Sequence, residues 1–333
     1  MVMAPPVADS PWIVPARRVL SAWETWKLGR ARRLARFAGQ QVLSEEDAND
    51  AIAAALRRGA PFLAGRMGFH ELDAVVTQNG VLARQSSSRW RRWRSQLRAE
   101  PGTWNEGLLQ SLDQIAGFFP AEPEMAARLA TELTQAFSEI DLAAIWFRRY
   151  EDELMRSHAP GARPILPRGL EPYYHAKPWS MALAGMRVLI VHPYEQSIRA
   201  QFPRHREIFG SRRVWPACEL LTVKTVQTLA GERAGFDNWF DALAHMRRMI
   251  DAVEFDVAIV GAGAYGLPLA AHVKRMGKMA IHMGGATQLL FGIRGKRWDD
   301  RPEVTRLYNE HWVRPSAEET PPAHRSVENG AYW

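Results

Sequence analysis

The sequence predicts an α/β protein in which an open, mostly parallel sheet carries helices on both faces and follows a helical amino-terminal region. Across residues 186–291, short apolar segments rich in β-branched residues alternate with segments of helical length. Parallel strands need crossover connections of that length, and strands covered on both faces form continuous apolar runs. The pattern therefore indicates a Rossmann-like sheet, which binds its ligands beyond the carboxyl ends of its strands.

Length and composition allow a large buried core, because 47% of the 333 residues are hydrophobic. A single cysteine, Cys218, excludes an intramolecular disulfide and a cysteine-based zinc site. No early segment has the long apolar run of a signal peptide or membrane span, so we expect a cytoplasmic protein. The net charge of +7 favours anionic partners such as phosphates, nucleic acid or acidic lipids.

Shifts in composition divide the chain into four predicted regions. Residues 1–15 contain four prolines and are expected to form a flexible arm. Residues 16–180 are expected to be mainly helical, and residues 181–300 to form the α/β domain. Residues 301–333 end in two aromatic side chains, which is unusual for an exposed terminus, so we expect this tail to pack back on the domain.

The amino-terminal region is expected to hold several helices and one strand. Residues 16–39 form a basic, tryptophan-containing helix, and a second helix begins after Ser44 and ends at Gly59. A strand follows at 61–64, and residues 105–155 are expected to be wholly helical.

Tryptophan and arginine alternate in two parts of this region, at residues 16–39 and 90–94. That pairing suits lipid headgroups, stacked bases or sugar rings. For residues 16–39 two interpretations stay open: a solvated basic face over a packed apolar stripe, or a helix that lies on a membrane surface.

The α/β region is expected to place usable side chains at every strand end. Strands are predicted at 186–192, 219–226, 255–260 and 278–282, with helices at 197–209, 238–253, 265–276 and 287–291. Polar residues or glycines follow each strand, and we expect them to converge on one ligand site. The candidate binding residues are His192, Glu195, Gly261, Gly263, Tyr265, Gly266, His282, Gly284, Gly285 and Gln288.

The glycines Gly261, Gly263 and Gly266 have the G-x-G-x-x-G spacing between an apolar strand and a helix. Such a turn lets backbone amides and the positive helix end face a phosphate. The alternative is that the glycines only allow strand and helix to pack closely. A nicotinamide or flavin site would need an acid at the end of the next strand, and that strand ends in His282.

Several of these candidates also have an ordinary structural interpretation. His192 and Glu195 suit an acceptor hydroxyl or a ribose, yet a single histidine is often a buried structural residue. His282 is the stronger candidate because glycines follow it. Three basic residues beyond it form either a phosphate-facing cluster or a solvated turn, namely Arg294, Lys296 and Arg297.

Arg66, Gly68 and Glu71 follow the first predicted strand as Arg-x-Gly-x-x-Glu. The arginine can neutralise an anionic leaving group, and the glutamate can act as a base or as a metal ligand. An ordinary salt bridge at the start of a helix would use the same residues.

With these residues and the later segments at 177–180, 188–193, 261–266 and 280–285, the sequence resembles the GT-D-type glycosyltransferases over residues 60–300. These bacterial enzymes carry an Arg-x-Gly-x-x-Glu signature and a Rossmann-like half. The resemblance implies hexosyl-type transfer from a nucleotide sugar to a glycan or lipid-linked acceptor in surface polysaccharide assembly. It also implies Arg66 and Glu71 as catalytic residues, Gly68 as a donor-binding residue and a divalent metal, Mn²⁺ or Mg²⁺.

The sequence departs from this signature at one position. Phe69 stands where the family has an aspartate of its metal motif, which leaves Glu71 and His70 as candidate metal ligands.

Two other function classes are compatible with the sequence. One is an NAD(P)- or FAD-dependent oxidoreductase that uses the Gly261 loop, and the other is a non-catalytic binder of nucleic acid or a membrane surface. For a glycosyltransferase we expect no specific nucleic-acid partner, and the basic tryptophan segments suit peripheral contact with the inner membrane face.

Overall fold

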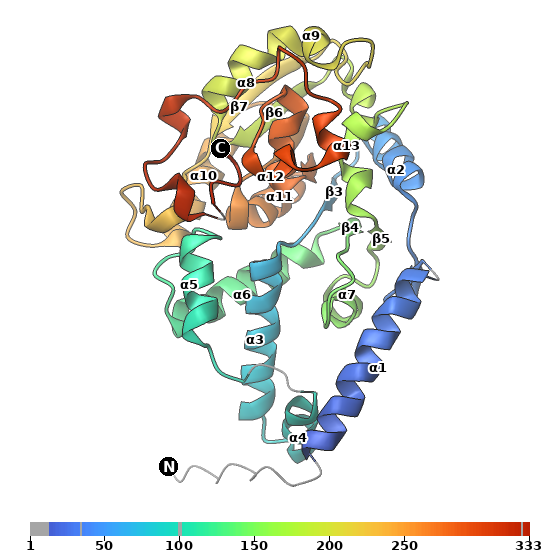
Figure 1. The fold of residues 1–333 in the computed structure, drawn as a ribbon, viewed down its shortest axis with the longest axis vertical. Coiled ribbons are helices and arrows are strands. Elements are labelled where there is room, and N and C mark those ends of the chain that lie inside the picture. The colour runs from blue at the N-terminus through green and yellow to red at the C-terminus, as the bar shows by residue number, and fades with distance from the viewer. Residues whose placement is uncertain (1–12, 34, 99–101, 328) are drawn as a thin grey trace.

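The computed structural model describes residues 13–33, 35–98, 102–327 and 329–333 (Figure 1). Within them, one seven-stranded sheet has the order β5-β4-β3-β9-β8-β6-β7, and every neighbouring pair is parallel. This confirms the predicted α/β class and its open parallel sheet. The strands are β3 (Phe62–Gly65), β4 (Leu142–Ala144), β5 (Arg163–Ile165), β6 (Arg187–His192), β7 (Glu219–Lys224), β8 (Val257–Val260) and β9 (Met279–His282).

The sheet extends across the predicted boundary at residue 181. Strand β3 pairs with β9, with Leu63 opposite Ala280, and β4 and β5 continue the sheet beyond β3. The prediction that residues 105–155 are wholly helical is wrong at β4. That strand has only three residues, two of them alanines, so it lacks the β-branched signal of a strand although it is buried.

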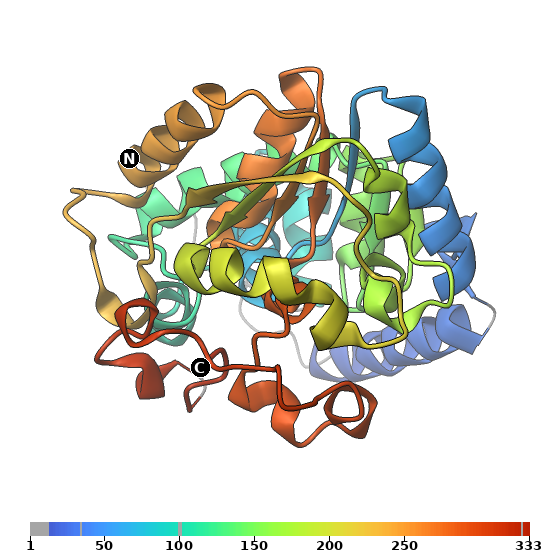
Figure 2. The ribbon, with the colours of Figure 1, turned by 90° about the horizontal axis from the view of Figure 1, so that it is seen from above.

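Helices cover both faces of the sheet (Figure 2). The side chain of Leu63 packs into the core on one face, while its neighbours Phe62 and Ala64 pack on the other, as the alternation of a strand requires. The first face holds α3 (Phe69–Gln85), α5 (Glu106–Gln114), α6 (Pro123–Ser138), α7 (Glu151–His158), α10 (Trp239–Asp251) and α11 (Gly266–Arg275). The second holds α2 (Glu45–Arg58), α8 (Glu195–Gln201), α9 (His205–Phe209) and the 3₁₀ segments η3 (Trp179–Leu183) and η7 (Gly284–Phe291).

Helix α2 begins and ends as its sequence predicts. The Ser44 hydroxyl accepts a hydrogen bond from the Asp47 amide at 3.1 Å, which satisfies one of the free amides of the first turn. Gly59 ends the helix in the left-handed region at φ +68°, where its amide bonds the carbonyls of Ala55 and Leu56.

Helix α1 (Ile13–Arg33), a short hairpin and helix α4 (Arg89–Leu97) lie outside the seven-stranded sheet. Of the predicted flexible arm, residues 1–12 lie outside the described residues, and residues 13–15 begin helix α1. A hairpin of β1 (Arg36–Phe37) and β2 (Gln40–Gln41) follows, so the predicted helix at 16–39 ends early. Helix α4 lies beside α1 at the lower end of the molecule (Figure 1). None of the helices in the described ranges has the length and apolarity needed to cross a bilayer.

The last residues of the chain contact the α/β domain through the backbone. After α12 (Lys296–Asp299) and α13 (Pro302–Thr305), the chain returns, so that the amide of Lys296 bonds the carbonyl of Trp333 at 3.1 Å. The Gln288 side chain donates to the carbonyl of Tyr332 at 3.1 Å. The carboxylate of Glu319 accepts from the Gln196 amide in the first turn of α8 at 2.7 Å, where the helix dipole favours a negative charge. These contacts bring Tyr332 to the carboxyl end of the sheet.

Candidate functional site

The topology places a crevice between β6 and β8. These neighbouring strands are followed by helices on opposite faces, α8 after β6 and α11 after β8, and their crossovers run in opposite directions along the sheet. Ligands of open α/β sheets bind at such switch points. A cavity of about 60 Å³ lies here, and it is lined by five of the predicted binding residues together with Tyr332. The five are His192, Gly261, Gly263, Gly285 and Gln288.

His192 is a buried, neutral histidine at the end of β6. Its Nδ1 accepts the amide hydrogen of Tyr194 at 3.0 Å, which leaves the proton on Nε2. Burial lowers its pKa to about 3 because the charged imidazolium would lose its hydration. His192 can therefore donate a hydrogen bond from Nε2 but does not supply positive charge at neutral pH.

In the glycine-rich turn, two glycines are required for close packing and a third leaves the backbone accessible to a ligand. A Cβ on Gly261 would lie 2.7 Å from Cδ2 of His192, and one on Gly266 would lie 2.1 Å from Cε1 of His282. Close packing thus requires these two glycines. Gly263 differs, because it has a left-handed φ of +52° and its Cβ would meet only the Ala116 carbonyl oxygen, at an ordinary contact distance of 3.8 Å. Gly263 is therefore the position in this turn where a ligand can approach the backbone.

Three predicted binding residues have other partners. The hydroxyl of Tyr265 lies 3.0 Å from that of Thr228, and its ring stacks on Trp239 within the core. Glu195 accepts a hydrogen bond from Thr222 at 2.6 Å and pairs with Arg199 at 3.1 Å. Gln288 lines the cavity, but its amide is already used to hold the backbone of the tail and of Ile293.

A second, larger cavity of about 460 Å³ lies beside the first and contains Arg66. Its wall is rich in arginine and aromatic side chains, and it also holds the carboxyl groups of Glu45, Glu171 and Glu303. The arginines are Arg66, Arg168, Arg297 and Arg301, and the aromatic residues are Phe69, Trp146, Tyr174 and Trp298. Four clustered guanidinium groups suit a phosphorylated ligand, and one of them, on Arg168, already pairs with Glu303 at 3.2 Å.

Arg66 is held in this cavity by an aromatic ring. Its guanidinium lies 5.2 Å from the centre of the Trp146 ring, and the Trp146 indole donates to the Met67 carbonyl at 3.0 Å. Phe69 packs against the same indole with a centroid distance of 4.7 Å. Phe69, which stands where the GT-D-type signature has an aspartate, thus supports the ring beneath Arg66.

Arg66 has no carboxylate within 4 Å among the described residues, and neither has Arg301. The salt bridge between Arg66 and Glu71, one of the two sequence interpretations, is therefore not formed in the described structure. Both guanidinium groups face a cavity in which the Glu171 carboxyl group lies beyond salt-bridge distance, so their hydrogen-bond donors are available to an anionic ligand.

Glu71 is half-buried in the first turn of α3, with its carboxylate folded back over Gly68. A Cβ on Gly68 would lie 2.1 Å from Oε2 of Glu71. Burial raises the pKa of Glu71, although its own backbone amide and the charges of His70 and Arg66 act in the opposite direction. A carboxylate with a raised pKa is better suited to accept a proton near neutral pH.

Glu171 is a second carboxyl group with a perturbed pKa in the arginine-lined cavity. Burial raises its pKa, while Arg66, the Tyr173 hydroxyl at 3.0 Å and Arg168 lower it. Glu171 is not among the site residues that the sequence predicts.

Residues 282–286 form the partition between the two cavities. His282 donates from Nδ1 to the Val260 carbonyl at 3.1 Å, and burial lowers its pKa to about 4, with a smaller effect from Arg66. A Cβ on Gly284 would lie 2.9 Å from Nη2 of Arg66, and one on Gly285 would lie 2.5 Å from the Tyr332 ring. The two glycines therefore let Arg66 and Tyr332 approach the backbone from opposite sides.

The predicted metal ligands do not form a metal site by themselves. His70 and Glu71 are neighbours in α3, but nowhere in the described ranges do three His, Cys, Asp or Glu side chains gather as metal ligands. Two protein ligands of this kind do not fit a resident metal centre, and we derive no chemical step through one.

The arginine-lined cavity contains several residues that the sequence did not reveal. The sequence left the role of three basic residues open, and of these only Arg297 lines the cavity. Lys296 donates to the Asn329 carbonyl, and the guanidinium of Arg294 lies over the Tyr308 ring. Trp146 was hidden in the stretch predicted to be helical. Arg168 lies in the 3₁₀ segment η1 (Pro167–Leu170) and Arg301 in the connection between α12 and α13, and neither belongs to a sequence motif.

An apolar cavity of about 620 Å³ borders the arginine-lined cavity and shares Trp146, Leu166 and Pro167 with it. Apolar side chains from the segments that follow β2 and β4 make up much of its wall. They are Val42, Leu43, Ile145 and Phe147.

Comparison of the chain with protein-family models, with curated proteins and with solved structures gave no match.

Proposed function

We propose that the protein is a glycosyltransferase that moves a sugar from a nucleotide-sugar donor to an acceptor hydroxyl in glycan assembly. The observation that carries the proposal is the arginine-lined cavity, in which Arg66 and Arg301 have no carboxylate partner among the described residues. A diphosphate offers the oxygens that such guanidinium groups bind. The cavity lies beside the switch-point crevice, where the nucleoside would find a turn that admits close approach at Gly263.

The residues present support a direct transfer. The acceptor oxygen forms a bond to the anomeric carbon while the bond from that carbon to the diphosphate oxygen breaks, and the electron pair leaves with the diphosphate. Arg66 stabilises the charge that develops there. The acceptor proton passes to a carboxylate, and Glu71, with its raised pKa beside Arg66, is suited to that role.

The neighbouring apolar cavity supports a place for the acceptor. It meets the arginine-lined cavity at Trp146, Leu166 and Pro167, so a molecule there would approach the reacting carbon from the side opposite the nucleoside cavity. An apolar wall favours an acceptor that carries an apolar group, such as a lipid-linked glycan.

Isothermal titration calorimetry of the full chain with UDP, GDP, CMP, their sugar conjugates and NAD(P), each with and without Mn²⁺, tests the proposal. We expect one nucleotide sugar to bind. Arg66→Ala should weaken it by about ten-fold or more, because a hydrogen bond to a charged group contributes roughly 1.5–3 kcal/mol. Arg206→Ala, which removes an exposed arginine on α9, is the matched control and should bind as the wild type does.

Binding of NAD(P) alone would favour the oxidoreductase interpretation, and no response to any nucleotide sugar would overturn the proposal. An Arg66→Ala variant that binds as tightly as the wild type would also contradict it.

A further inference from the structure

Large apolar side chains are exposed at the end of the molecule farthest from the sheet. They lie on α1, on α4 and near the end of α3, three elements that come together at the lower end of the view in Figure 1. We call this set the tryptophan face: Val19, Trp23, Trp26, Leu82, Trp90 and Trp93, with exposed fractions of 45–70%. Isolated exposed apolar residues are ordinary, but a cluster with four tryptophans indicates an interaction surface.

The helical spacing of α1 puts its large exposed apolar residues and Arg30 on one side. Val19, Trp23, Trp26 and Arg30 follow at intervals of four, three and four residues, and all four are exposed. Glu24 lies on the other side of the helix and is buried. On α4, Trp90 and Trp93 are one turn apart, and their rings stack at 5.0 Å.

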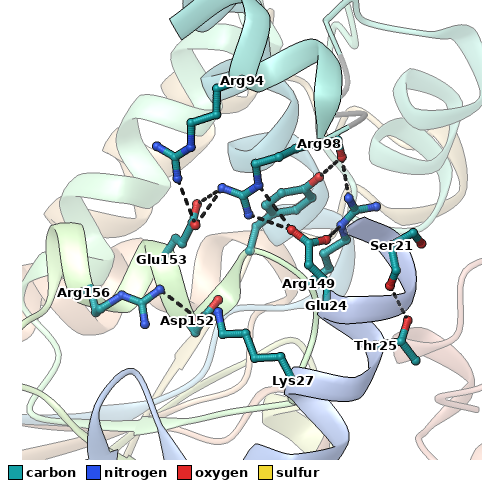
Figure 3. Close-up of polar contacts among 11 residues, drawn as sticks. Ser21, Glu24, Thr25, Lys27, Arg94, Arg98, Arg149, Asp152, Glu153 and Arg156 are labelled. Atoms are coloured by element: carbon teal, nitrogen blue, oxygen red, sulfur yellow. Dashed lines mark hydrogen bonds and ion pairs between the residues drawn. The ribbon is translucent and has the colours of Figure 1, made fainter. Parts of the chain in front are cut away.

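The carboxylates near this face form ion pairs with arginine and lysine side chains of neighbouring elements (Figure 3). Glu24, the only acid in the sequence of α1, pairs with Arg98 at 3.1 Å and with Arg149. Glu153 pairs with Arg98 at 2.6 Å. Helix α4 contains no acid at all.

Asp152 pairs with Lys27 at 2.5 Å and with Arg156 at 2.9 Å. Burial alone would raise the pKa of Asp152, but these two cations outweigh it and hold the pKa below its ordinary value, so the carboxylate stays charged and paired. The same contacts fix α1 against α7, which gives the face a defined shape.

The charge left on the outside of these helices is positive. Exposed arginines lie on the same two helices as the tryptophans, and the guanidinium of Arg30 lies 5.3 Å from the Trp26 ring. Among the side chains that the structure describes on α1 and α4, the exposed cations are Arg30, Arg32, Arg89, Arg91 and Arg94.

We propose that the tryptophan face docks the protein on a bilayer that contains anionic lipids. Tryptophan prefers the boundary between headgroups and acyl chains, where its ring is in apolar surroundings and its N–H meets water or headgroups. Basic residues beside it are drawn to an anionic leaflet. The side chains of both kinds project from helices held in place by the ion pairs with neighbouring elements, so binding needs little further ordering. This proposal does not depend on the reaction that the protein performs.

Co-sedimentation with vesicles of phosphatidylcholine, with and without phosphatidylglycerol, tests the proposal on the full chain. We expect binding that grows with the phosphatidylglycerol content, with a blue shift of tryptophan fluorescence. Arg89→Gln with Arg91→Gln should weaken binding about 30-fold, because each charge near the surface contributes a factor of roughly five. Arg57→Gln with Arg58→Gln removes two exposed charges from the end of α2 and should leave binding unchanged.

Trp90→Ser with Trp93→Ser should abolish the fluorescence shift and most of the binding, while thermal unfolding followed by circular dichroism shows that the variant is folded. Failure of the wild-type protein to bind these vesicles would overturn the proposal. Equal loss of binding in the α2 and α4 arginine variants would do so as well. Self-association that the tryptophan variant abolishes, or salt-dependent RNA binding without vesicle binding, would assign the face to a second copy or to nucleic acid instead.

Discussion

Gly68 controls where the Glu71 carboxylate lies. Its φ of −71° and ψ of 168° suit any residue, so Gly68→Ala strains no backbone, but the new Cβ would lie 2.1 Å from Oε2 of Glu71. We expect the carboxylate to swing away and glycosyl transfer to fall by about 100-fold, the lower range for loss of a general base. The free energy of unfolding should change by less than about 1 kcal/mol.

Steady-state rates and urea denaturation measure the two effects separately. Gly161→Ala is the matched control, because nothing lies within 4 Å of its Cβ position, and it should leave both unchanged. Full activity in Gly68→Ala would show that the position of Glu71 does not matter for the reaction.

At the scale of single residues, the sequence predicted the site where a residue directly follows a strand. His192, Gly261 and Gly285 line one cavity because the carboxyl ends of parallel strands meet at one edge of the sheet. Trp146 and Glu171 escaped prediction because their roles come from contacts with Arg66 and Tyr173 that no local pattern encodes. The partners of Tyr265 and Glu195 are equally non-local.

The loop from β4 to α7 fixes Trp146 beneath Arg66 through one carboxylate. Glu151, in the first turn of α7, accepts hydrogen bonds from the amides of Trp146 at 3.0 Å and of Arg148 at 2.9 Å. The loop thus satisfies amides that would otherwise be buried without partners. Burial nevertheless raises the pKa of Glu151 to about 7, because the hydrogen bonds offset only part of the lost hydration.

That shift makes the stability depend on pH with a definite sign. Between about pH 4.5 and 7 the folded protein holds a proton on Glu151 that the unfolded chain has released, so stability falls as pH rises across this window. The contribution of this group is about 3 kcal/mol. Glu151→Gln keeps an acceptor for the amides but cannot titrate. Urea denaturation at several pH values should therefore show the variant gaining stability relative to the wild type as pH rises; a constant difference would contradict the shifted pKa.

At the scale of elements, the length and composition of a segment decided how well the sequence predicted it. The run Arg187–His192 is apolar and β-branched, and residues 186–192 were predicted as a strand, whereas Leu142–Ala144 was missed. The shorter strand exists because β3 and β5 pair with it on both sides, for example at Ala64 with Leu142. Tertiary pairing of this kind overrides weak local propensity.

At the scale of the whole molecule, the pairing of β3 with β9 brings the two halves of the site together. Ala64 lies opposite Ile281, so Arg66 and His282 leave neighbouring strands at the same edge. The alternation of strands and helices predicts a parallel sheet after residue 181, but it does not reveal that a strand near residue 62 lies beside the last one. Such a long-range pairing depends on the packing of complete faces and not on local periodicity.

The end of the chain is expected to stabilise both the fold and the site. Tyr332 lines the switch-point cavity, and its hydroxyl accepts a hydrogen bond from Arg297 of the arginine-lined cavity at 3.2 Å. Trp333 is buried, and its indole donates to the Glu319 carbonyl at 3.0 Å. Deletion of residues 331–333 should lower the free energy of unfolding by about 3–5 kcal/mol, the usual cost of losing a buried tryptophan, and weaken nucleotide-sugar binding.

Tyr332→Phe separates these two contributions, because it removes only the hydroxyl that holds Arg297. Its unfolding free energy should fall by about 1 kcal/mol, the typical net value of one hydrogen bond. Calorimetric titration should show weaker donor binding than in the wild type, because Arg297 loses this hydrogen bond although its guanidinium still lies over the ring. Donor binding that is unchanged in both variants would mean that the tail supports the fold without bordering the site, and the donor would then have to lie against η7 and Arg66 alone.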